Sequence, residues 1–152
     1  MKTCEGCEGR VTRTRKQEVL VVSGRRFVVS LPARACRSCG VQADAASLER
    51  IELEVACELA REGPASGETF RFMRKALGMR AMDLADLLGI TPETVSRWEN
   101  GQRLVDRSAW IALGSMVLEK ARRSTATVQR LRTFKNPPAG TRSIRIVLGR
   151  SG

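Results

Sequence analysis

Residues 78–101 read GMRAMDLADLLGITPETVSRWENG, and their pattern largely determines how the C-terminal half of the chain folds. The larger apolar side chains recur at the spacing of two short helices that bury one face against a common core, and they are Leu84, Leu88, Ile90, Val95 and Trp98. Gly89 stands where the first helix has to end and the chain has to turn sharply. Thr91 suits the N-cap of the second helix, and Pro92 suits its first position, where no amide hydrogen bond is lost. The stretch therefore predicts a helix-turn-helix whose second helix has roughly nine residues.

The end of this stretch, Ser96 to Gly101, resembles the Ser-Arg-Trp-Glu-x-Gly ending of the Xre/Cro-type DNA-binding domains. A helical hairpin of another kind would also bury Leu and Val at this spacing, but Gly89, Thr91-Pro92 and Trp98-Glu99 would then all have to coincide. We therefore expect the second helix to enter the major groove of duplex DNA by its N-terminal half. Glu99 is expected to orient the motif through an internal hydrogen bond.

The candidate base contacts are outward-facing residues of that helix, because Val95 and Trp98 are expected to face the core. Arg97 can donate two hydrogen bonds to guanine, Glu93 can accept one from a cytosine amino group, and Thr94 can contact a thymine methyl group. Glu93 lies in the first helical turn, where a carboxylate is equally expected as capping chemistry. The candidate phosphate contacts lie near helix ends, where plain surface charge is the alternative, and they are Lys75, Arg80 and Arg103.

Four of the five cysteines form two pairs, Cys4-Glu5-Gly6-Cys7 and Cys36-Arg37-Ser38-Cys39, separated by 28 residues. Each pair is typical of a knuckle whose tight turn points two sulfur atoms at one ion, and two knuckles complete the tetrahedral thiolate shell of structural zinc. The chain contains no histidine, which excludes a mixed cysteine–histidine site. The pattern therefore predicts one structural zinc ion per chain, held by Cys4, Cys7, Cys36 and Cys39, and a reversible dithiol is the alternative. Cys57 lies among apolar residues of a predicted helix and is assigned no chemistry.

The rest of the chain reads as a small ribbon followed by helices. Apolar and β-branched runs at 17–22 and 27–31 predict a β-hairpin between the knuckles, with Pro32 ending its second strand. A helical stripe at 45–61 ends in the segment Gly63-Pro64-Ala65-Ser66-Gly67, which indicates a domain boundary. We therefore predict an α+β fold in which a zinc ribbon precedes an all-α helix-turn-helix domain. The predicted domains are a zinc ribbon at 1–44, a connecting helix and linker at 45–66, an Xre-type helix-turn-helix domain at 67–120 and a basic C-terminal tail at 121–152.

Two further helices are predicted on either side of the motif. Phe70, Met73 and Leu77 have the spacing of a buried helical stripe before it, and Asp106 suits the N-cap of a helix after it. The Pro- and Gly-containing segment at 136–140 is expected to end any helix or strand that precedes it. An alternation beyond that segment indicates either a late strand or a disordered tail, and its members are Ile144, Ile146 and Leu148.

The chain carries 27 Lys and Arg against 16 Asp and Glu, a formal net charge of +11, which favours a polyanionic partner such as nucleic acid. Residues 120–152 hold nine of the basic residues and no acid, so this segment is expected either to clamp DNA phosphates or to act as a solubilising arm. The longest apolar run, Ala109 to Leu113, is too short to span a membrane, and the N-terminus does not read as a secretory signal, so we expect a cytoplasmic protein. The absence of His and Tyr and the closed four-thiolate site argue against an enzyme.

A four-cysteine ribbon followed by an Xre-type domain resembles the MqsA (YgiT-type) family of zinc-ribbon antitoxins and regulators, over residues 4–118. The resemblance implies that the ribbon binds an RNA-cleaving toxin, while the helical domain dimerises and represses its own operon. The sequence departs from that family at Glu8, where glycine is usual, at Arg80-Ala81, in place of Ser/Thr-Gln, and in the length of its basic tail.

The predicted function is a sequence-specific DNA-binding transcriptional regulator that acts as the autorepressing antitoxin of a type II toxin–antitoxin system. We expect a homodimer on a palindromic operator in double-stranded DNA, because one recognition helix contacts too few base pairs for useful specificity. The alternatives are a stand-alone regulator without a toxin, a thiol redox sensor, and a basic zinc-ribbon RNA-binding protein. The chain has few aromatic residues on which RNA bases could stack, which argues against the RNA-binding alternative.

Overall fold

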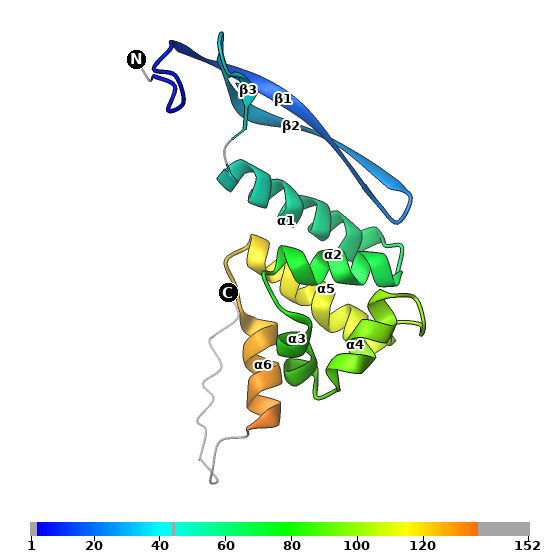
Figure 1. Ribbon diagram of the computed structural model, residues 1–152. Coiled ribbons are helices and arrows are strands. Elements are labelled where there is room, and N and C mark those ends of the chain that lie inside the picture. The colour runs from blue at the N-terminus through cyan, green and yellow to red at the C-terminus, as the bar shows by residue number, and fades with distance from the viewer. Residues whose placement is uncertain (1–2, 44, 137–152) are drawn as a thin grey trace, which may run out of the picture.

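The computed structural model describes residues 3–43 and 45–136 of the chain. The elements in these ranges are β1 (Val11–Val22), β2 (Arg25–Cys36), β3 (Gly40–Gln42), α1 (Ala45–Glu62), α2 (Gly67–Ala76), α3 (Ala81–Leu88), α4 (Pro92–Glu99), α5 (Arg107–Ala121) and α6 (Ala126–Lys135). A long hairpin lies over α1, and the other helices pack on the opposite side of α1 (Figure 1). The predicted α+β fold is confirmed. No helix of the described ranges combines the length and the apolar character that a membrane span requires.

The hairpin of β1 and β2 is closed by a two-residue turn. Ser23 and Gly24 both take the left-handed conformation, with φ of 50° and 79°. Positive φ at both central positions is the signature of the type I′ turn, whose twist matches that of the flanking strands. β3 pairs only with the end of β2, so the sheet order is β1-β2-β3 and most of the hairpin has two strands.

The expectation that Pro32 ends the second strand is wrong, because β2 continues to Cys36. In an antiparallel ladder, pairs whose two residues exchange backbone hydrogen bonds alternate with pairs whose residues do not. The alternation can be counted from Val22, which pairs with Arg25 beside the turn. Pro32 pairs with Arg15 at a position of the kind that exchanges no hydrogen bonds with β1. The N–H that proline lacks would therefore face the open edge of β2, where its loss breaks no ladder bond.

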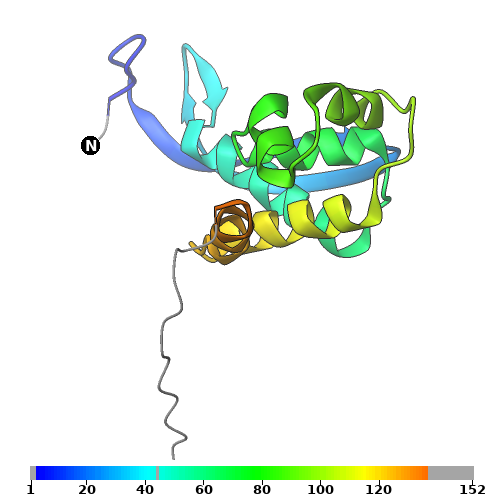
Figure 2. The same cartoon turned by 90° about the horizontal axis from the view of Figure 1, so that it is seen from below.

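α1 contributes to two hydrophobic cores. The hairpin core combines one stripe of α1 with the inner face of the strands, and its buried members are Val22, Leu31, Ile51, Val55 and Leu59. On another side of the helix, Ala56 and Cys57 belong to the core of the helical domain. A Cβ on Gly114 would lie 3.5 Å from the Cβ of Ala60, so α1 and α5 pack closely. Seen from below, the hairpin lies behind the helices, with α1 joining the two parts (Figure 2).

The helix-turn-helix forms with the predicted caps. α3 ends at Gly89, which takes the left-handed conformation with φ of 69°. The Thr91 hydroxyl accepts a hydrogen bond from the N–H of Thr94 at 3.2 Å, and Pro92 is the first residue of α4. Asp106 caps α5 in the same way, as predicted. The large side chains that are at most 4 % exposed in this domain include Phe70, Met73, Leu84, Val95, Trp98, Leu113 and Met116.

α6 lies within the segment predicted to be a basic tail, and this helix was not predicted. The carboxylate of Glu119 at the end of α5 accepts hydrogen bonds from the N–H and the hydroxyl of Thr127, each at 2.8 Å. At its other end, α6 contacts α3 through an ion pair between Lys135 and Asp86. The late strand expected around Ile144, Ile146 and Leu148 lies outside the described residues.

Candidate metal centre and nucleic-acid interface

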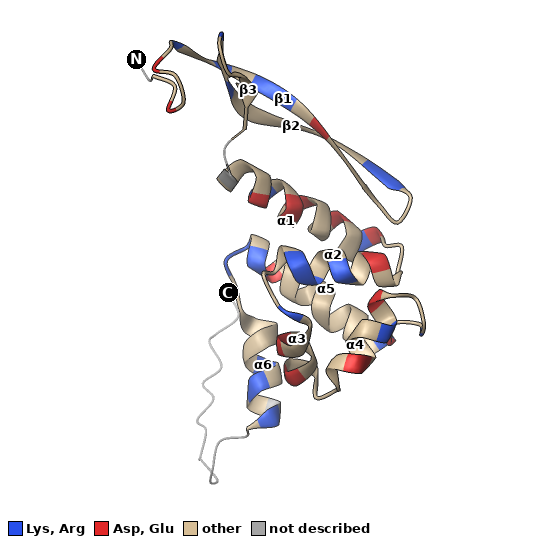
Figure 3. Cartoon of the chain, viewed as in Figure 1, with Lys and Arg blue, Asp and Glu red and all other residues tan. Residues whose placement is uncertain are grey.

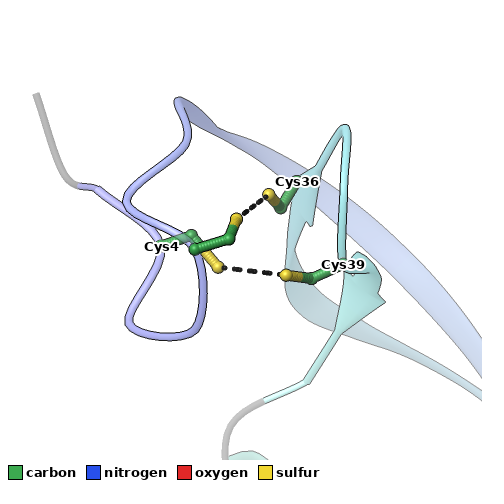
Figure 4. Close-up of side chains that lie close together, drawn as sticks. Cys4, Cys36 and Cys39 are labelled. Carbon is green, nitrogen blue, oxygen red and sulfur yellow. Dashed lines mark hydrogen bonds between the residues drawn. The ribbon is translucent and has the colours of Figure 1, made fainter.

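The four paired cysteines come together at the end of the ribbon that lies away from the hairpin turn, and Figure 4 shows Cys4, Cys36 and Cys39 in this cluster. Their sulfur atoms all lie within 4.8 Å of one another, with 3.7 Å between Cys4 and Cys39 and 3.3 Å between Cys7 and Cys36. A disulfide would require about 2.05 Å, and all four residues are free thiols. Tetrahedral zinc with Zn–S bonds of about 2.3 Å separates its sulfur ligands by about 3.8 Å. The cluster is therefore a single site that fits one structural zinc ion, as predicted.

A tight loop before β1 positions the first two thiols. The N–H of Glu8 donates to the carbonyl of Cys4, and the N–H of Cys4 donates to the carbonyl of Gly9, each at 2.9 Å. Glu8 takes the left-handed conformation with φ of 56°, at the position where the resembled antitoxins usually have glycine. A Cβ on Gly9 would lie 3.3 Å from the sulfur of Cys7 and 3.4 Å from that of Cys36. The loop thus wraps closely around the sulfur atoms that it presents.

The backbone of the second knuckle favours a thiolate. Hydrogen bonds from the backbone N–H groups of Cys39 and Ser38 lower the pKa of Cys36 to about 6, with a smaller contribution from the side chain of Cys7. Hydrogen bonding with the side chains of Cys7 and Cys4, together with burial, raises the pKa of Cys39 to about 12. Metal coordination requires deprotonated sulfur, and the backbone N–H groups directed at Cys36 favour that state. Cys57 is 1 % exposed and lies outside the cluster, and burial raises the pKa of its thiol.

α4 is held against α2 by a nearly buried ion pair. The Nε and Nη2 atoms of Arg74 donate to the carboxylate of Glu99 at 2.6 and 2.9 Å, and Nη1 donates to the carbonyl of Met79 at 2.7 Å. The two side chains are 9 % and 8 % exposed. This pair confirms the internal bond predicted for Glu99. Its partner was missed, because no local pattern marks Arg74 as buried among the other charged residues of α2.

Close packing also fixes the position of α4 against α2. A Cβ on Gly67 would lie 1.9 Å from the carbonyl oxygen of Trp98, so only glycine allows the start of α2 to approach the end of α4 this closely. The rings of Phe70 and Trp98 meet edge to face with their centroids 5.7 Å apart. α4 is therefore a rigid helix with one side committed to the core.

The other side of α4 is open. Its exposed side chains are Glu93, Ser96, Arg97 and Asn100. Within the described ranges, Glu93 and Arg97 have no side-chain hydrogen bond or ion pair, whereas the amide of Asn100 donates to the hydroxyl of Ser96 at 3.2 Å. Ser96 and Asn100 were not among the predicted contacts, although their helical spacing from Glu93 and Arg97 places them on the same face. Thr94 is half-buried, and its hydroxyl lies 3.0 Å from the Thr91 hydroxyl.

The three basic residues predicted to contact phosphates lie in different places. Arg103 follows α4, and its N–H donates to the carbonyl of Arg97 at 3.2 Å. Arg80 precedes α3, where its guanidinium donates two hydrogen bonds of 2.8 Å to Asp83. These bonds raise the pKa of Arg80 and lower that of Asp83. Lys75 is exposed on the side of α2 that faces the hairpin turn, where it lines a hollow with residues of β1. The structure thus places Arg103 beside Arg97 and Lys75 on the ribbon side of the domain.

Charge is distributed unevenly over the elements (Figure 3). The hairpin strands and α6 carry mainly Lys and Arg, whereas α1 carries mainly Glu. A polyanion is therefore attracted to some faces of the molecule and repelled from the exposed side of α1.

One part of the chain matches a known protein family. Residues 66–117 match the family model described as a helix-turn-helix domain. The match begins at Ser66, the N-cap of α2, and includes the Arg74–Glu99 pair and most of α5. The chain as a whole has no match among curated proteins. Residues 66–117 therefore form a helix-turn-helix domain, the kind of domain that DNA-binding regulators carry.

Proposed function

We propose that this chain is a zinc-containing, sequence-specific DNA-binding regulator of transcription. The observation that carries the proposal is the open face of α4, where Glu93 and Arg97 are unpaired among the described residues. The opposite face is anchored by Val95 and Trp98. A helix held in this way can enter the major groove with its free side chains directed at base edges.

Arg97 is assigned the principal base contact, because a free guanidinium can donate two parallel hydrogen bonds to O6 and N7 of guanine. Glu93 is assigned to a cytosine amino group. Thr94 is assigned to a thymine through its methyl group, since its hydroxyl is within hydrogen-bond distance of Thr91. The residues assigned to phosphates are Arg80, Arg103 and Lys75. Arg103 is the most direct of the three, because it lies at the end of the same helix.

We further propose that a homodimer binds a palindromic operator. A single recognition helix contacts only a few base pairs, and a two-fold dimer doubles the contacted sequence. Half-sites are then expected one helical turn apart, about 34 Å centre to centre.

The ribbon is proposed to be a partner-binding module. The resemblance to zinc-ribbon antitoxins implies an RNA-cleaving toxin as the partner and repression of the chain's own operon as the output. The outer face of the hairpin supports this role, since Val19 and Val28 pair across the strands and are 48 % and 59 % exposed. An exposed apolar patch of this kind is typical of a protein interaction surface. The proposal contains no catalytic step, because a four-thiolate zinc site has no open position for water.

Selection from a random pool of duplexes tests the DNA-binding proposal. We expect the full-length, zinc-loaded protein to enrich a palindrome, and footprinting to show two protected half-sites one helical turn apart. Competitor RNA of equal charge should displace the protein from scrambled duplexes and leave it on the enriched sequence. A protein that enriches no duplex sequence and binds RNA equally well would contradict the proposal.

A further inference from the structure

A pocket of about 570 Å³ lies where the end of α5, the first part of α6 and the turn between α2 and α3 meet. Sites for small molecules typically have volumes of about 300–1,000 Å³. The apolar part of its lining consists of the half-buried side chains of Leu77, Met79 and Val128, with Met116, 2 % exposed, packed beneath them. These elements include neither the ribbon nor the recognition helix, so the pocket is distinct from the metal centre and from the proposed base-contacting face.

Three cations stand at the wall of this pocket, namely Lys120, Arg123 and Arg132. They belong to the basic regions at the end of α5 and on α6 (Figure 3). Lys120 is already engaged, because its Nζ donates to the carbonyl of Ala76 at 2.9 Å. The guanidinium groups of Arg123 and Arg132 have no hydrogen-bond or ion-pair partner in the part of the chain that the structure describes. The lining therefore combines apolar side chains, called the apolar floor below, with two guanidinium groups that are free among the described residues.

Glu119 also lines the pocket, but its charge is directed elsewhere. Its carboxylate accepts from the N–H and the hydroxyl of Thr127, and the guanidinium of Arg130 lies 3.8 Å away. These contacts, the N–H of Thr127 foremost, hold the pKa of Glu119 below its ordinary value. The carboxylate is thus bound to the N-terminal turn of α6, and it does not neutralise the positive charges of Arg123 and Arg132.

We propose that this pocket binds a small amphipathic carboxylate, with its apolar body against Met79 and Met116 and its carboxylate between Arg123 and Arg132. Arginine pairs with a carboxylate through two parallel hydrogen bonds, which a hydroxyl cannot reproduce. A small polar anion would satisfy the arginines and leave the apolar floor uncovered. An uncharged apolar molecule would cover the floor and leave the guanidinium groups without a partner. The lining therefore selects a molecule that has both parts.

The methionines of the chain provide a direct readout in the full-length, zinc-loaded protein. In a titration of methyl-¹³C-methionine protein with octanoate, the resonances of Met79 and Met116 should shift saturably. Met73 in the core and Met82, which is 54 % exposed on α3, lie outside the lining and should not shift. Acetate has the same headgroup without the chain, and octanol has the chain without the charge. Each should bind at least about tenfold more weakly than octanoate, because each loses one of the two interactions.

Substitutions separate the pocket from general electrostatic attraction. Arg123→Gln and Arg132→Gln should each weaken octanoate binding about tenfold, since each removes a charge-assisted pair. Arg122→Gln removes the same charge from a neighbouring position outside the lining and should leave the affinity unchanged. Circular dichroism of each variant checks that the helices are retained. The proposal is overturned if Met79 and Met116 show no saturable shift, if octanol binds as tightly as octanoate, or if Arg122→Gln weakens binding as much as Arg123→Gln.

Discussion

Arg74 and Glu99 join α2 to the end of α4 while both side chains are nearly buried. Such a pair adds little net stability, because the desolvation of two ions offsets their attraction. Removal of one partner, however, leaves an uncompensated charge in the interior. The pair therefore acts mainly as a constraint on where α4 lies, which is what a helix that reads DNA requires.

Glu99→Ala should lower the free energy of unfolding by about 3–5 kcal/mol, because it strands the guanidinium of Arg74. The double variant Arg74→Met/Glu99→Leu should lose much less, since no buried charge remains. The exposed pair of Arg61 and Glu58 supplies the control, and Glu58→Ala should change stability by no more than about 0.5 kcal/mol. Urea unfolding followed by tryptophan fluorescence measures all three. Similar losses for Glu99→Ala and Glu58→Ala would show that the buried pair has no special role.

Glu8 holds a left-handed conformation in the first cysteine loop, which costs a residue other than glycine about 1–2 kcal/mol. Glu8→Gly should therefore stabilise the zinc-loaded ribbon by about 1 kcal/mol. Glu5→Gly removes the same charge from the same loop without relieving a positive φ, and it should not stabilise. Hydrogen exchange of the ribbon amides reports both effects. A ribbon that is less protected in Glu8→Gly than in the unmodified chain would refute the strain argument.

Most helices and strands carry signals that are local in the sequence, and those elements could be predicted. The cap at Thr91, the stop at Gly89 and the cap at Asp106 each lie at the boundary that they define. Pro32 led to a wrong prediction of where β2 ends. A strand tolerates proline at a position whose N–H would face an open edge, and the pairing register decides which positions these are. The roles of α1 and α6 depend on contacts between distant segments, and no local pattern contains them.

The candidate sites likewise divide into those that local sequence signals predict and those that depend on contacts between distant segments. The spacing of the cysteines was sufficient to group the four thiols, because each knuckle is a local turn. Helical periodicity was sufficient to place Glu93 and Arg97 on the open face of α4. The internal bond of Glu99 was predicted, but its partner Arg74 and the pocket beside α6 could not be, since both form where separate helices meet.

The docking of α6 should depend on pH through Glu119. The hydrogen bond from the N–H of Thr127 is the main reason that the pKa of this carboxyl is lowered in the folded chain. A lowered pKa stabilises the folded state above the ordinary value of 4.5 and ceases to do so as the pH falls through the lowered value. Hydrogen exchange of the α6 amides should therefore accelerate as the pH falls below 4.5, after correction for the intrinsic rate. Glu119→Gln should abolish this pH dependence, and an unchanged dependence in that variant would assign it to another group.

The molecule as a whole is a ribbon with a four-thiolate metal site, joined to a helical domain through α1. The metal cluster lies at one end of the hairpin, whereas Val22 packs against α1 beside the turn at the other end and Leu31 packs near the middle of β2. Loss of the metal should therefore disorder the two cysteine loops first and leave the helical domain folded.

Chelation of zinc, or the substitution Cys36→Ser, should remove the hydrogen-exchange protection of residues 3–10 and 36–43 while residues 67–121 keep theirs. Cys57→Ser is the control, because Cys57 lies outside the cluster and its variant should retain one zinc per chain. If chelation also unfolded the helical domain, the cores on the two sides of α1 would be one cooperative unit, contrary to this prediction.

The assignment on which the regulatory role depends is that α4 reads DNA sequence through Arg97. Fluorescence anisotropy titrations of the enriched operator and of a scrambled duplex, at several salt concentrations, separate reading from electrostatic attraction. Arg97→Ala should weaken operator binding by about 1–3 kcal/mol and reduce the operator preference, because it deletes a base-edge contact. Arg103→Ala should weaken both duplexes by a similar factor and reduce the salt slope by about 0.9, because a phosphate contact carries no sequence information. An Arg97→Ala protein that keeps the full preference for its operator would contradict the assignment of α4 as the reading helix.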